Sequence, residues 1–146
     1  ARQARGDLAE ARRNLDEAAD AVDGLAGDSP IAGHIHLAAK IYLRAGALRK
    51  ATGAHAEALA AFEKGLDASR RLVEKRPDDP RSARMVVAAH LARAKLHEKL
   101  ERQKKARAAY RQALEQLRKL AKTDSGVQKD IARLEARCRA LGAEKE

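Results

Sequence analysis

The chain has 146 residues, of which 45% are hydrophobic, 2% are aromatic and one is a cysteine, and its formal net charge is +10. A single cysteine excludes an intrachain disulfide framework, and no apolar run approaches the ~18 residues of a transmembrane helix. Alanine accounts for 34 residues, which favours closely packed helices over a sheet protein rich in Val, Ile and Phe. We expect one all-α domain located in the cytoplasm.

The positive charge is concentrated in the C-terminal half of the chain. Residues 1–30 carry seven acidic and four basic side chains, whereas residues 81–146 carry 18 basic and eight acidic ones. A half of this kind can attract nucleic acid, an anionic membrane or an acidic protein surface, and charge alone does not choose among them.

The first predicted helix covers residues 7–26. Ala11, Leu15 and Ala18 are four and then three residues apart, and Leu25 follows seven residues later. These steps place all four residues on one stripe of a helix. The small residues let a neighbouring helix approach closely, and the large residue fills the space beside them.

The same order of small and large residues recurs in two more predicted helices, at 55–76 and 103–122. The second set is Ala58, Phe62, Gly65 and Leu72, and the third is Ala106, Tyr110, Ala113 and Leu120. The period is 47 residues and then 48. Self-similarity at such a fixed period indicates a repeat architecture.

A chain breaker and a second helix follow each of these three segments. The breakers are GDSP ending at Pro30, RPDDP ending at Pro80 and TDSG ending at Gly126, and the helices after them are predicted at 30–52, 80–101 and 126–141. An Asp or Ser before a proline predicts an N-cap, because proline is tolerated in the first turn of a helix. The connections between these ranges are only a few residues long, so we expect six helices with antiparallel neighbours.

The spacing within one unit resembles that of the tetratricopeptide repeat (TPR). Gly46, Gly53, Ala58, Phe62 and Gly65 stand where that family has a small residue, a glycine, an alanine, an aromatic residue and a second small residue. The long unit is similar to the TPR arrays attached to bacterial serine/threonine kinases and other signalling proteins. The resemblance implies a right-handed α-α superhelix that acts as a scaffold for protein partners and not as an enzyme.

The repeat predicts how this single domain of residues 1–146 is divided. We expect the second half of an opened repeat at 1–29, complete repeats at 30–78 and 79–124, and a capping helix at 125–146. The opened repeat suggests a piece of a longer array within a larger protein. It also leaves self-assembly through stacked repeats as an alternative function, because another copy could cover the apolar surface at that end.

The TPR resemblance also implies a concave groove lined by the first helix of each repeat, where a peptide or partner segment binds. Carried over to this sequence, the groove residues are Lys40, Leu43, Arg44, Ala47, Lys50, Leu91, Lys95 and Lys99. The predicted lining is basic with apolar spots and suits an acidic segment. The Asn and Lys residues that complete the family's clamp for chaperone C-termini are replaced here, so a chaperone tail is not the expected partner.

A basic stretch near the start of the helix at 103–122 supports a second alternative. It comprises Arg102, Lys104, Lys105, Arg107 and Arg111. Such a surface could bind nucleic acid or an anionic membrane. Against nucleic acid, the only aromatic residues, Tyr42, Phe62 and Tyr110, are used by the repeat core, which leaves none for stacking on bases.

The remaining candidate residues favour packing over chemistry. His34 and His36 would point about 200° apart on a helix, and a zinc site needs three or four ligands. His90, His97 and Cys138 stand at positions that pack in the repeat core, and no recognisable nucleotide, metalloprotease or hydrolase motif is present. We therefore expect no catalytic residue, no metal and no cofactor.

Overall fold

The computed structural model describes residues 2–28 and 31–143, which are almost entirely helical. Its elements are α1 (Arg2–Asp28), α2 (Ala32–Ala51), α3 (His55–Lys75), α4 (Pro80–Lys99), α5 (Gln103–Ala121), a short 3-10 helix η1 (Ser125–Val127) and α6 (Gln128–Ala143). The described residues contain no strand, so the all-α prediction is confirmed. None of these helices combines the length and the apolar character that crossing a membrane requires.

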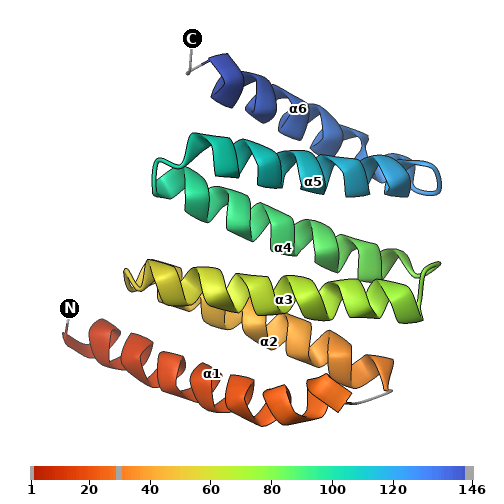
Figure 1. The fold of residues 1–146 in the computed structure, drawn as a ribbon. Coiled ribbons are helices and arrows are strands. Elements are labelled where there is room, and N and C mark those ends of the chain that lie inside the picture. The colour runs from red at the N-terminus through yellow and green to blue at the C-terminus, as the bar shows by residue number, and fades with distance from the viewer. Residues whose placement is uncertain (1, 29–30, 144–146) are drawn as a thin grey trace.

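The helices lie in a row from α1 to α6, and each runs opposite to the one before it (Figure 1). Consecutive helices pack against each other along the whole row, and α2 also contacts α4 across the intervening helix. The predicted antiparallel arrangement is therefore present among the described residues. Short connections place each helix beside its neighbours in sequence, and a row of this kind results.

Three predicted boundaries need correction. The first helix begins at Arg2, well before residue 7, because nothing in the sequence before Gly6 breaks a helix. The second begins at Ala32, with Ile31 as an N-cap that forms no side-chain hydrogen bond, and the capping role predicted for Ser29 lies outside the described residues. The breaker before the last helix forms the 3-10 turn η1 and is not a plain loop.

The turns between helices have clear physical causes. Asp79 caps α4 by accepting a 2.9 Å hydrogen bond from the backbone N–H of Arg81, with Pro80 in the first turn, as predicted. Gly53 ends the α2–α3 turn with φ +85°, a conformation that costs glycine little. The equivalent residue between α4 and α5 is Glu101, which adopts φ 59° without being glycine.

The repeat pattern explains how α2 packs on α3. The ring of Phe62 on α3 comes within 2.5 Å of the place where a Cβ on Gly46 of α2 would lie, and Leu43 comes within 2.8 Å of the same place on Gly65. Each helix thus offers a small residue to a large one on the other. In the next pair, Ala94 and Leu91 of α4 pack in one cluster with Tyr110 and Ala113 of α5.

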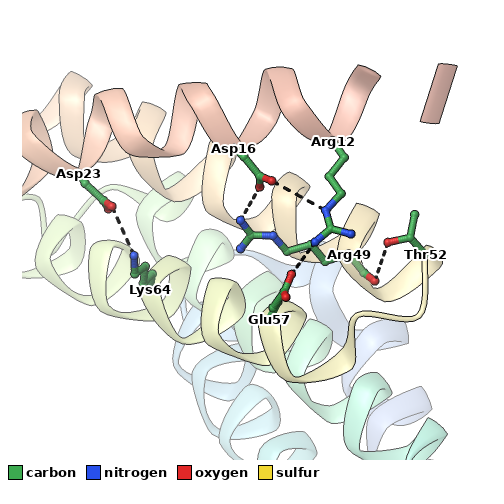
Figure 2. Close-up of polar contacts among 7 residues, drawn as sticks. All are labelled: Arg12, Asp16, Asp23, Arg49, Thr52, Glu57 and Lys64. Carbon is green, nitrogen blue, oxygen red and sulfur yellow. Dashed lines mark hydrogen bonds and ion pairs between the residues drawn. The ribbon is translucent and has the colours of Figure 1, made fainter. Parts of the chain in front are cut away.

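Polar contacts fasten α1 to the rest of the row (Figure 2). Arg12 of α1 forms an ion pair with Glu57 of α3 at 2.6 Å, and Asp16 pairs with Arg49 of α2. Asp23 accepts hydrogen bonds from the hydroxyl of Tyr42 and, at 3.3 Å, from the ammonium group of Lys64. These contacts accompany a small apolar contact: among the α1 side chains that the structure describes, residues 4–23, only Ala19 and Val22 are buried.

Candidate partner-binding groove

A hollow of about 500 Å³ lies between α2 and α4. Its walls include the apolar side chains of Leu43, Ala47 and Leu91, and the ammonium groups of Lys50 and Lys95 stand beside them. The hollow exists because α2 and α4 contact each other across α3, which leaves their outer faces side by side. The floor is closed by Phe62 of α3.

A second hollow of about 520 Å³ continues from the first toward α6. It shares Leu91 and Lys95 with the first hollow and adds apolar side chains from α4, α5 and α6. These additional residues are Val87, Tyr110, Leu117, Leu134, Ala136 and Ala140, with Asp130, Arg133 and Arg137 at the rim. We call the two connected hollows the groove; volumes of this size lie in the range of ligand-binding clefts.

The groove carries an excess of positive charge on its α2–α4 side. Burial, together with the nearby charges of Lys99 and Lys95, lowers the pKa of Lys50. Neighbouring cations therefore act on Lys50 without a compensating carboxylate among the causes of its shift. Such a cluster favours a negatively charged ligand.

On the α6 side the charges are partly paired. Glu98 of α4 accepts a 3.1 Å hydrogen bond from the hydroxyl of Tyr110 and forms an ion pair with Arg137 of α6. Arg133 stands 3.9 Å from Asp130, and both side chains are more than half exposed. Exposed pairs of this kind contribute little, so Arg133 remains accessible to a ligand carboxylate.

The structure brings together most of the residues predicted for the groove. Leu43, Ala47, Lys50, Leu91 and Lys95 all line the first hollow, and Lys99 is close enough to influence Lys50. Lys40 and Arg44 are exposed on α2 but do not line either hollow. The positive charge of the groove thus comes from residues further along α2 and α4 than Lys40 and Arg44.

The contribution of α6 to the groove was not predicted from the sequence. Ala136 and Ala140 are the residues of α6 that correspond to Lys40 and Arg44 of α2, at intervals of twice 48 residues, and both line the second hollow. Extending the repeat correspondence to α6 would have found these two. Arg137 lies between those positions and Arg133 lies before them, and neither carries a signal that distinguishes it from a solvated helix face.

The basic stretch at the start of α5 is divided between two sides of the helix. Burial, followed by the charges of Arg93, Arg102 and Lys105, lowers the pKa of the buried His97. Arg107 lies against Gly142 of α6, on a different side of α5. Arg111 also acts on Cys138 of α6, while Lys104 is exposed. Because a helix turns by about 100° per residue, Lys104, Arg107 and Arg111 share one face of α5 through their spacing of three and four residues, whereas Lys105 lies on another side.

Two of the histidines, His90 and His97, and the cysteine, Cys138, are buried. His90 is 2% exposed, and burial together with Arg93 and Arg70 lowers its pKa to about 4. Burial raises the pKa of the Cys138 thiol although Arg111 and Arg107 act in the opposite direction, which disfavours the reactive thiolate. In the described part of the chain, no three His, Cys, Asp or Glu side chains are grouped as a metal site would need, and His34 and His36 are both half-buried on α2.

No family model, no curated protein and no solved structure matches this chain.

Proposed function

We propose that the chain is a TPR-like repeat module, with its helices in a right-handed superhelix, that binds an acidic segment of a partner protein in the groove. The function is binding and not catalysis, and it fits a scaffold within a larger signalling protein. The observation that carries the proposal is the combination in one groove of an apolar floor with clustered, uncompensated lysines.

The chemistry of the groove specifies the partner segment. Leu43, Leu91 and Leu134 offer places for apolar side chains, whose burial contributes about 25 cal/mol per Å². Lys50, Lys95 and Arg133 offer positive charge along the same path. A segment that alternates Asp or Glu with leucine therefore matches both features better than a purely acidic or a purely apolar one.

The proposal is tested by measuring the affinity of a labelled acidic peptide containing spaced leucines for the chain and for two charge-reversed variants. The double variant Lys50→Glu/Lys95→Glu should weaken binding by about tenfold or more, equivalent to ~1.4 kcal/mol per factor of ten. The matched control is Lys40→Glu/Arg44→Glu, which makes the same change in net charge on residues outside both hollows.

The control separates specific binding from general attraction. If both double variants lose affinity equally, the peptide responds to net charge alone and the groove is not its site. If the affinity instead depends on Lys104, Lys105 and Arg107 and falls steeply with salt, the basic stretch of α5 is the binding surface.

A further inference from the structure

The end of the row formed by α1 and α2 has a partly exposed apolar strip. Ala11, Leu15 and Ala18 of α1 are all half-buried. Their equivalents on α3 are almost fully buried, with Ala58 at 0% and Phe62 at 2% exposure. The same holds on α5, where the equivalents are Ala106, Tyr110 and Ala113.

The burial on α3 and α5 comes from the helix that precedes each of them. α2 places Gly46 against Phe62 and Leu43 against Gly65 of α3. α4 places Ala94 and Leu91 in one cluster with Tyr110 and Ala113 of α5. In both cases the covering helix presents a leucine and, three residues later, a small residue. We call this pattern the leucine-small pair.

The outer side of α2 is uncovered at the same end. Leu37 of α2 is 51% exposed, whereas its equivalent 48 residues later, Met85 of α4, packs against a buried cluster of α1, α2 and α3. Leu8 of α1 is 44% exposed as well. The strip of α1 and the outer side of α2 are thus the faces that a further helix would cover if the row continued.

Charge indicates which kind of helix fits. The covering helices are basic: α2 has no acidic residue and α4 has only Glu98. The flank of α1 beside the strip is acidic, because Asp7, Glu10 and Glu17 are exposed there and form no ion pair with any described residue. The ion pairs of Arg12, Asp16 and Asp23 lie on the side that faces α2 and α3 (Figure 2).

We propose that this face docks a basic amphipathic helix from outside residues 1–146, which carries a leucine-small pair and covers α1 as α2 covers α3. The small residue of the incoming helix lies over Leu15, and its leucine lies over Ala18. Its Lys and Arg residues face the acidic flank of α1. This site is separate from the groove and does not depend on what the groove binds.

The test uses a probe that the chain itself provides. A helix-stapled peptide with the sequence of residues 80–101 carries Leu91 and Ala94 as its leucine-small pair and should bind the chain measurably by fluorescence anisotropy. Ala18→Arg on the strip should weaken that binding at least tenfold. Ala9→Arg makes the same change at an exposed residue elsewhere on α1 and should leave binding within about twofold.

A peptide of identical composition controls for charge. Exchanging the pair, with Leu91→Ala and Ala94→Leu in the peptide, keeps its net charge and should reduce the affinity for the chain about tenfold. Equal binding of the two peptides, or equal effects of Ala18→Arg and Ala9→Arg, would overturn the proposal. So would self-association of the chain in light scattering that Ala18→Arg abolishes, because the occupant would then be a second copy.

Discussion

α1 and α3 carry the same order of small and large residues, but they are stabilised very differently. Phe62 of α3 is 2% exposed, between α2 on one side and α4 on the other. Leu15 of α1 is only half-buried, because α2 alone packs substantially on α1. The pattern therefore defines a face that can be buried, and a neighbouring helix determines whether it is.

A second comparison separates the two central pairs, α2–α3 and α4–α5. They share one plan, yet Gly46, Tyr42 and Gly53 of the first correspond to Ala94, His90 and Glu101 of the second. The first pair approaches more closely at Gly46, and the second contains a buried histidine and a turn residue that adopts positive φ without being glycine. These differences predict distinct responses to substitution and to pH.

The largest expected difference is between Phe62→Ala and Leu15→Ala. Removing a buried ring should cost about 3–5 kcal/mol, whereas truncating a half-exposed leucine at an uncovered face should cost about 1 kcal/mol. Guanidinium unfolding monitored by circular dichroism gives both values. Similar losses for the two variants would mean that α1 is covered as fully as α3.

Acid should destabilise the chain through the α4–α5 pair. His90 contacts Arg93 at 3.3 Å through its Nδ1 atom, and burial holds its pKa near 4, below the usual 6.5. The unfolded chain takes up this proton near pH 6.5 and the folded chain only near pH 4. Stability should therefore fall by up to about 3 kcal/mol as the pH is lowered through this window.

The control for this pH effect is His90→Leu, which removes the proton site from the buried position. The variant should show a flatter dependence of unfolding free energy on pH between 6.5 and 4. The lowered pKa of His97 acts in the same direction, so a residual slope is expected. An unchanged slope would assign the pH dependence to other groups.

Gly46→Ala and Gly33→Ala should have opposite signs. A Cβ on Gly46 would meet the Phe62 ring at 2.5 Å, whereas nothing lies within 4 Å of the Cβ position on Gly33. Overpacking at Gly46 should cost about 1–3 kcal/mol, reduced by the better helix propensity of alanine. At Gly33 only the better helix propensity of alanine acts, and the substitution should stabilise the chain by about 0.5–1 kcal/mol. Thermal unfolding measures both effects. Stabilisation of both variants would contradict the close approach of Phe62 to Gly46.

The smallest predicted effect concerns the two turns. Glu101→Gly should stabilise the chain by about 0.5–1 kcal/mol, because Glu101 adopts a positive φ that glycine adopts without strain. Gly53→Ala should destabilise it by about 1 kcal/mol for the converse reason. Urea unfolding distinguishes these outcomes, and a loss of stability in Glu101→Gly would show that the Glu101 side chain contributes more than its strain removes.

The helices and turns were predictable because their signals are local. The stripe around Phe62, the Asp79–Pro80 cap and the turn glycine Gly53 act within a few residues of themselves, and the structure agrees with each. The start of α1 was not predictable in this way, because the helix continues back to Arg2 and no capping or breaking residue marks where it begins.

The groove was predictable only in part, because it depends on which faces of distant helices meet. The repeat correspondence located Leu43, Lys50, Leu91 and Lys95, which line one hollow. The position of Arg137 beside Glu98 depends on how α6 packs over α4 and α5, and no spacing in the sequence encodes it. The basic stretch of α5 illustrates the converse, since Lys105 lies near His97 while Lys104, Arg107 and Arg111 share another side of the helix.

The most direct test of the groove is a map of where an acidic, leucine-containing peptide contacts the chain. Titrating it into the ¹⁵N-labelled chain should shift backbone amide resonances most strongly in α2, α4 and α6, around Leu43, Leu91 and Leu134. Shifts confined to residues 102–111 of α5, or to the open face of α1, would contradict the account.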